Sequence, residues 1–185
     1  IVAPAADKAS RFMQLCDAFD IPIVSLCDTP GFMVGPEAEK TALVRHVCRM
    51  FVTARSISVP LFGIVLRKCY GLGAQAMLAG GAYDDFFTVS WPTGEFGPMG
   101  LEGAVKLGFK RELDALTDPV DKQALYNKLL AEYYEQGKAI SVASTLEIDA
   151  VIDPVETRCW ILGGLRSASL RPPLSGRKRS FVDTW

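Results

Sequence analysis

Blocks of apolar and polar residues alternate along the chain and predict helices and strands in turn. Residues 5–19 carry apolar side chains every three to four positions, which predicts a helix. Residues 21–27 are mostly apolar and predict a strand buried on both faces, as in a parallel sheet. The same two patterns recur farther along. They predict helices over 40–56, 71–81, 101–107, 118–134 and 153–168, and strands over 59–66 and 86–89.

Two of these helices begin with capping residues. Asp118 precedes Pro119, and these residue types are favoured at the N-cap and at the first helical position. Gly137 is expected to end that helix. Asp153, followed three residues later by Glu156, has the form of a capping box. Strands and helices that alternate in this way predict an α/β layered fold.

In such a fold, the loops that follow strands carry the chemistry. Three loops qualify here, residues 28–39, 67–74 and 91–100. The second is the most informative, because the apolar run 61–66 breaks on two cations and a small-residue helix begins at Gly71. A strand-to-helix turn of this kind aims unpaired backbone N–H groups at one point. We therefore expect an anionic oxygen to be bound at this turn.

Composition narrows the class of function. The 185 residues are 49% hydrophobic and 22% charged, with a net charge of −1, which gives no electrostatic signature of nucleic-acid binding. No apolar run approaches the roughly 18–20 residues that a membrane span needs. Five widely spaced cysteines and one histidine make a zinc or other metal site unexpected. Together they indicate reduced thiols in a cytoplasmic protein.

One domain is expected over residues 1–168. It is followed by a basic, proline-bearing tail over 169–185 that has no periodicity. Such a tail is expected to be disordered alone or strapped onto a partner subunit. The chain begins with Ile1 instead of Met, which suggests a processed chain or an excised piece of a longer protein.

Few side chains qualify as conventional catalysts. His46 falls in the middle of an amphipathic helix and no serine lies in an elbow motif, so we expect it at a helix contact or an interface. Glu95 and Glu102 could act as acid and base, or they could only cap turns. Arg67 and Lys68 could bind an anion or close an ion pair at the strand end, and both alternatives stay open.

Five short motifs follow one another along the chain. They are Asp28-Thr29-Pro30-Gly31-Phe32, Arg45-His46, Arg67-Lys68-Cys69-Tyr70-Gly71, Trp91-Pro92-Thr93-Gly94-Glu95 and Met99-Gly100-Leu101-Glu102-Gly103-Ala104-Val105. In this order they resemble the carboxyltransferase component of biotin-dependent acyl-CoA carboxylases, the propionyl-CoA carboxylase beta-chain group and its decarboxylase relatives. The resemblance runs from Asp7 to about Leu165 and is to the C-terminal half of that component.

This resemblance implies an α/β fold of the crotonase/ClpP-like type, a superhelix of repeated β-β-α units. It also implies that the N-terminal half holds coenzyme A and one oxyanion hole, while the C-terminal half holds carboxybiotin and a second one. The active site lies where the N-terminal half of one subunit meets the C-terminal half of another. The chain would then supply only the biotin side and be inactive alone.

The implied activity is transfer of a carboxyl group between carboxybiotin and an acyl-CoA. The implied partners are the N-terminal carboxyltransferase half, a biotin carboxyl carrier with its biotin carboxylase component, and further copies in a homo-oligomer. Biotin would be attached to the carrier and not to this chain.

The resemblance also implies roles for single residues. Backbone N–H groups stabilise the ureido anion that carboxybiotin leaves, so no histidine or carboxylate base is needed. The catalytic positions are Gly71, Leu72 and Gly73, the biotin-binding positions are Phe32, Tyr70, Met99 and Gly100, and the substrate-binding position is Gln75. Gln75 stands where the family commonly has an aspartate that influences the choice of acyl chain. Leu72 stands where a glycine is common. The acyl group therefore stays open.

Three alternatives remain open beside the interpretation as a biotin-dependent carboxyltransferase. A decarboxylase of the same group would run the transfer from acyl-CoA to biotin. A hydratase or isomerase of the same fold would use Glu95 or Glu102 as a base and would need no biotin. A non-catalytic subunit would keep the fold and only dock a biotin carrier.

Overall fold

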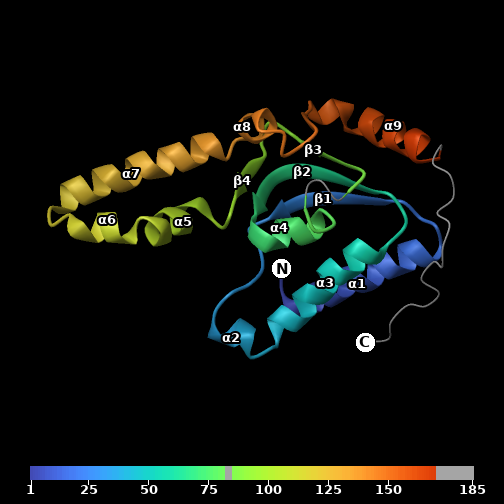
Figure 1. Cartoon of the computed structure of the whole chain (residues 1–185), viewed down its shortest axis with the longest axis horizontal. Helices are drawn as coiled ribbons and strands as arrows, with labels where there is room; N and C mark the ends of the chain where they lie inside the picture. The colour runs from blue at the N-terminus through green and yellow to red at the C-terminus, as the bar shows by residue number, and fades with distance from the viewer. Residues whose placement is uncertain (82–84, 170–185) are drawn as a thin grey trace.

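Helices lie on both faces of one parallel β-sheet (Figure 1). The structure is a computed structural model, and it describes residues 1–81 and 85–169. Its elements in chain order are α1 (Ala3–Ala18), β1 (Ile23–Thr29), α2 (Pro36–Glu39), α3 (Leu43–Ser56), β2 (Leu61–Tyr70), α4 (Gly71–Met77), β3 (Phe87–Ser90), β4 (Glu95–Gly97), α5 (Leu101–Gly108), α6 (Lys110–Ala115), α7 (Pro119–Gln136), α8 (Ala139–Ser144), β5 (Ala150–Val151), the 3₁₀ turn η1 (Pro154–Glu156) and α9 (Thr157–Ser169).

Strand β2 is the centre of the sheet. The strands run in the order β1-β2-β3-β5, and each of these pairings is parallel. Residues 62–65 of β2 pair with β3, while residues 68–70 pair with β4, beyond the end of β3. Parallel neighbours need crossover connections, and the helices between the strands supply them. The predicted α/β fold with a parallel sheet is therefore confirmed.

Separate apolar cores lie on the two faces of the sheet. On one face, Met13 of α1 and Met50 of α3 pack with Ile23 of β1. On the other, Phe62 and Phe87 stack with ring centroids 5.0 Å apart, and helix α9 covers them. Figure 1 shows α9 opposite α1, α3 and α4 across the sheet.

Strand β1 differs from the prediction of a strand buried on both faces. Ile23 and Cys27 are buried, but Val24 and Leu26 are 42% and 52% exposed. The strand lies at the edge of the sheet, and α9 packs on Phe62 and Phe87 of the neighbouring strands instead. The prediction is wrong because an apolar run alone does not say whether an edge strand has a helix over each face.

The predicted loop 67–74 is also wrong. Strand β2 continues through Tyr70, and helix α4 begins at the next residue. The extra strand residues are held by β4, with Lys68 opposite Glu95. Helix α4 ends at Met77, short of the predicted residue 81, and Ala79 and Gly80 have positive φ.

Capping signals located the later helices correctly. The Asp118 side chain accepts a 2.7 Å hydrogen bond from the Val120 N–H, and Gly137 is the C-cap of α7. The capping box of Asp153 and Glu156 is present at η1, where α9 follows. The pattern missed α2, β4, α6, α8 and β5, and it began α3 three residues early.

Helices α5, α6 and α7 form a hairpin that projects from the body (Figure 1). Phe109 and Tyr133 pack edge to face across it, with centroids 6.0 Å apart. Helix α7 has no buried residue. Within the described ranges, no helix combines the length and the apolarity that crossing a bilayer requires. The predicted tail was residues 169–185; Ser169 is the last residue of α9, and residues 170–185 lie outside the described residues.

Candidate active site

The candidate site is the turn that joins β2 to α4. Tyr70 is the N-cap residue in extended conformation, and Gly71 follows with φ of 59°. A Cβ atom on Gly71 would lie 2.7 Å from the carbonyl oxygen of Pro98. Both the positive φ and this close approach require glycine here. The chain can thus turn from strand to helix without a connecting loop.

Gly73 brings a second loop against this turn. A Cβ atom on Gly73 would lie 2.6 Å from the carbonyl carbon of Gly31 and 2.9 Å from the nitrogen of Phe32. Gly31 itself has φ of 113° and donates its N–H to Thr29 Oγ1 at 3.2 Å. The backbone of the first predicted loop is therefore fixed directly beside α4.

Three predicted catalytic residues meet at this turn. The N–H groups of Gly71, Leu72 and Gly73 precede the first hydrogen bond within α4 and have no intrahelical acceptor. Within residues 1–81 and 85–169, no side-chain hydrogen bond caps this helix. Leu72 is 61% exposed, while Gly71 is half-buried and Gly73 is buried. Neighbouring N–H groups in this arrangement can bind an oxygen that carries negative charge.

Tyr70 anchors the turn from inside the protein. It is buried, and its hydroxyl donates a 2.7 Å hydrogen bond to Oε2 of Glu95 on β4. Burial and this carboxylate raise the pKa of Tyr70 well above its ordinary value, so the hydroxyl keeps its proton. The hydroxyl proton is therefore used in the bond to Glu95, and the biotin contact of Tyr70 stays a prediction.

The end of β2 carries an ion pair between Arg67 and Asp28. Arg67 forms an ion pair with Asp28, with Nη2 3.2 Å from Oδ2. Asp28 also accepts the Lys68 N–H at 3.1 Å. The Arg67 side chain and this N–H lower the pKa of Asp28. Of the two possibilities for Arg67, the structure favours the ion pair at the strand end.

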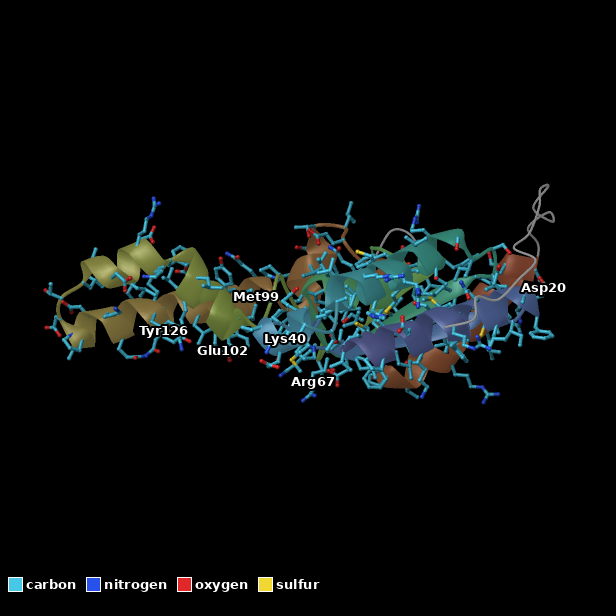
Figure 2. All side chains as sticks on the ribbon, turned by 90° about the horizontal axis from the view of Figure 1, so that it is seen from below. Asp20, Lys40, Arg67, Met99, Glu102 and Tyr126 are labelled. Carbon is cyan, nitrogen blue, oxygen red and sulfur yellow. The ribbon has the colours of Figure 1, made fainter. Side chains whose placement is uncertain are left out.

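Glu102 is held at the base of the hairpin, where α5 begins. It accepts a 2.7 Å hydrogen bond from the Tyr134 hydroxyl, which lowers the pKa of Glu102 and raises that of Tyr134 to about 12. Figure 2 shows Glu102 and Met99 where the hairpin joins the body. A carboxylate with a lowered pKa is a weaker base, so this environment does not favour the hydratase alternative.

The remaining predicted biotin contacts lie around the turn. Phe32 is half-buried and packs edge to face on Phe51, with centroids 6.1 Å apart. Met99 is 41% exposed, and Gly100 is the N-cap residue of α5. Exposed Met33 and Val34 continue the loop after Phe32. Apolar side chains thus lie in solvent on the segments that flank the turn.

A cavity of about 620 Å³ begins beside Gly71 and follows α4. Gln75, the predicted substrate contact, is exposed at its edge. Val142 of α8 and Ile148, which precedes β5, also line it. We call this space the α4 cavity.

His46, another candidate from the sequence, makes its polar contact with helix α1 and not with this turn. His46 Nδ1 is 2.7 Å from Oδ2 of Asp7, and Arg49 binds the other oxygen of the same carboxylate at 2.8 Å. This joins α3 to α1, as expected for a histidine at a helix contact. Among the described residues, no group of histidines, cysteines and carboxylates could hold a metal ion. Cys48 and Cys159 are exposed, and the other three cysteines are buried.

Sequence reasoning missed two parts of the site. One is Glu95 as the partner of Tyr70, and the other is the wall that α8 gives to the α4 cavity. Both depend on how β4 meets the end of α7, where Phe96 N–H donates to the Gly137 carbonyl at 2.7 Å. A contact between residues this far apart leaves no periodic signal in the sequence.

Comparisons with known proteins concern the family and the fold of the chain. A family model described as the carboxyl transferase domain matches residues 1–170. The biotin-dependent long chain acyl-coenzyme A carboxylase beta4 subunit of Mycobacterium tuberculosis is 39% identical over 156 residues, which are 83% of this chain and 29% of that protein. The chain spans only 29–33% of the length of the curated relatives that it matches.

Solved structures give the same result. A single-chain, multi-domain long-chain acyl-CoA carboxylase is 53% identical with a TM-score of 0.77, over 88% of this chain and 16% of that one. The transcarboxylase 12S hexamer core, with methylmalonyl-coenzyme A bound, is 32% identical with a TM-score of 0.84, over 100% of this chain and 35% of that one. These neighbours are crotonase-fold proteins, so the predicted fold class is confirmed.

Proposed function

This chain belongs to the carboxyl transferase domain family, and we propose that it forms the biotin side of a carboxyltransferase that moves a carboxyl group between biotin and an acyl-CoA. The observation that carries the proposal is the turn at Gly71–Gly73. It presents backbone N–H groups with no intrahelical acceptor, in a chain of this family.

The turn suits the ureido oxygen of biotin. Glycine at 71 and 73 lets two other backbone segments approach within van der Waals contact, and a methyl group at either position would collide with them. The donors are therefore fixed before any ligand arrives. Fixed donors need no reorganisation during the reaction, and removing one such donor costs about 3–4 kcal/mol of barrier in other enzymes.

Carboxybiotin, when bound, supplies the carboxyl group and leaves negative charge on its ureido oxygen. In our proposal the N–H groups of Leu72 and Gly73 hold that oxygen. Phe32, Met99 and Gly100 flank the ring and exclude water, and Tyr70 contributes through its backbone. Gln75 faces the acyl group. None of these roles requires a histidine or carboxylate base.

The exposed apolar groups around the turn support a site completed by a partner. Leu72 and Val34 are 61% and 81% exposed, an unfavourable surface unless another subunit covers it. We propose that the N-terminal carboxyltransferase half, with coenzyme A, is that partner within an oligomer. A biotin carboxyl carrier and its biotin carboxylase component would deliver the cofactor, in the cytoplasm.

The direction of transfer is a separate question. A decarboxylase would use the same donors to form carboxybiotin from an acyl-CoA, so the turn supports both directions. The names of the relatives cover short and long acyl chains and leave the acyl group open.

The test is to mix the chain with its N-terminal half and a biotinylated carrier, and then to assay decarboxylation of malonyl- and methylmalonyl-CoA. We expect turnover only with all components present, and inhibition by avidin. Turnover that avidin leaves unchanged would contradict the biotin role. Activity of this chain alone would contradict the composite site.

A further inference from the structure

A second cavity, of about 620 Å³, opens on the projecting hairpin. Its lining comes from α5 and α6 on one side of the hairpin and from α7 on the other. Tyr126 is one of the lining residues, and Figure 2 shows it farther out on the hairpin than Glu102. We call this space the hairpin cavity. It is separate from the α4 cavity, with which it shares no lining residue among those described.

Three lysines and one carboxylate line the hairpin cavity. Lys110 Nζ lies 2.6 Å from Oδ2 of Asp114, and Lys122 Nζ lies 3.1 Å from Oδ1 of the same carboxylate. Lys106 Nζ lies over the Tyr126 ring, 5.6 Å from its centroid. The lining therefore has an excess of positive charge, on ammonium groups that already have fixed neighbours. Such a surface attracts an anionic partner.

An apolar part lies beside these cations. Leu113 is buried, while Leu107 is 65% exposed, and both line the cavity. A small inorganic anion would use the lysines but leave Leu107 in water. A protein surface that covers Leu107 with an apolar side chain and faces the lysines with carboxylates satisfies both parts. The partner that fits best is therefore an acidic protein surface with an apolar residue in it.

A charged rim around a small apolar part suits a partner that binds and leaves. Permanent subunit interfaces are large and apolar, and exposed Leu72 and Val34 beside the turn fit that kind of contact. Charges at a rim chiefly raise the association rate. In the proposed function, the biotin carrier has to associate and dissociate in every turnover, because it moves the carboxyl group between two components.

Helix α7 links the hairpin cavity to the candidate site. It carries Lys122 and ends at Gly137, which lines the α4 cavity together with Gly71. Lys122 and Gly137 are about 22 Å apart along the helix axis. A domain of about 100 residues has a radius of gyration of about 13 Å, so one domain can contact the hairpin and still face the turn. We propose that the hairpin cavity docks an acidic patch of the biotin carrier; this inference rests on the proposed function.

Two double variants with equal changes in charge test this docking. Lys106→Gln/Lys122→Gln removes two cations from the cavity. Arg111→Gln/Lys128→Gln removes two exposed cations from α6 and α7, neither of which is among the described residues that line the cavity. All four side chains are exposed, so neither double variant disturbs the core.

The experiment uses this chain reconstituted with its N-terminal half, with malonyl- or methylmalonyl-CoA as carboxyl donor. It measures kcat and KM for the biotinylated carrier, and kcat/KM for free biotin, at 50 and 300 mM NaCl. Lys106→Gln/Lys122→Gln should raise the KM for the carrier about tenfold at 50 mM NaCl, with kcat unchanged. At 300 mM the difference should fall below about threefold, because salt screens exposed charges. Arg111→Gln/Lys128→Gln should stay within twofold, and kcat/KM for free biotin should not change in either.

Gln123→Lys tests the same inference in the opposite direction. Gln123 is exposed and lines the cavity, so a lysine there adds a positive charge to its rim. We expect the KM for the carrier to fall about threefold at 50 mM NaCl. Loss of structure cannot produce tighter binding, so this variant separates docking from stability.

Three results would overturn the inference: equal effects of the two double variants, an equal loss with free biotin, or a higher KM for the carrier in Gln123→Lys. Calorimetry that shows pyrophosphate binding to the unmodified chain but not to Lys106→Gln/Lys122→Gln, with the KM for the carrier unchanged, would make the cavity a site for a small anion instead. In all these cases, avidin-sensitive transfer to the carrier would still support the proposed function. Absence of transfer to both the carrier and free biotin would remove the proposed function itself.

Discussion

The hydroxyl of Tyr70 donates a 2.7 Å hydrogen bond to Oε2 of Glu95, and this bond links the residue before the Gly71–Gly73 turn to strand β4. The same strand pairs with β2 and meets the end of α7 through the Gly137 carbonyl. The orientation of the turn thus depends on β4, which begins 25 residues after Tyr70 in the sequence.

Tyr70→Phe removes only this hydroxyl. We expect kcat to fall about tenfold, since a hydrogen bond to a charged acceptor contributes about 1.5–3 kcal/mol, while the KM for acyl-CoA stays within twofold. Steady-state kinetics of the reconstituted enzyme measure both constants. Tyr134→Phe is the control, because its hydroxyl bonds Glu102 at the base of the hairpin. Equal losses in the two variants would contradict a positioning role for Tyr70.

Gly73→Ala tests the close approach to Gly31. The new methyl group would lie 2.6 Å from backbone carbon, which cannot rotate away, so the turn and the loop must separate. We expect carboxyl transfer to fall by more than about tenfold, because the N–H donors shift relative to the bound oxygen.

Gly163→Ala is the control for this variant. Gly163 lies in α9, and apart from the adjoining residues and nearby backbone of that helix, no atom of the described residues lies within 4 Å of a Cβ built there. This variant should retain full transfer. If Gly73→Ala also retained it, the packing of these backbones would not matter for the reaction.

Local signals in the sequence predicted local structure well. Asp118 and Asp153 located two helix starts, and Gly71 located the turn, because caps and positive φ depend on only a few neighbouring residues. The exposure of the Val24 side chain on β1 could not be predicted from local signals. It depends on which strand ends the sheet, and that is decided by pairing between distant segments.

The candidate site divides in the same way. The motifs of the family identified Leu72 and Gly73, which lie together on one turn. They gave no sign that Glu95 accepts the Tyr70 hydroxyl or that Val142 lines the same cavity as Gln75. Those contacts arise only after β4 and α8 have packed against the end of β2.

The ion pair of Arg67 and Asp28 predicts a titration. Asp28 has a lowered pKa in the folded protein, so the pair contributes stability above the unfolded value of about 3.9 and loses it as pH falls through the folded pKa. Arg67→Met should raise the pKa of Asp28, measured by carboxyl-carbon NMR between pH 2 and 6. The effect on unfolding should be less than about 1 kcal/mol, because Arg67 is 61% exposed. An unchanged pKa would show that the Lys68 N–H alone sets it.

Asp17 predicts a larger loss of stability. It is 1% exposed near the end of α1, and its Oδ1 accepts the Ser58 N–H at 2.7 Å, the Ser58 hydroxyl at 2.8 Å and the Val59 N–H at 3.3 Å. These bonds fix the segment that leads from α3 into β2. Asp17→Ala leaves all three donors without this acceptor, so we expect about 2–4 kcal/mol less stability, measured by urea unfolding.

Asp17→Asn separates hydrogen bonding from charge at this position. Its amide oxygen can still accept at the position of Oδ1, while the buried Oδ2, which has no partner among the described residues, is replaced by an uncharged NH₂ group. We expect a loss smaller than that of Asp17→Ala, since three donors keep their acceptor and only the new amide hydrogens lack one. A loss as large as that of Asp17→Ala would mean that the negative charge, and not the set of accepted hydrogen bonds, holds the α3–β2 connection in place.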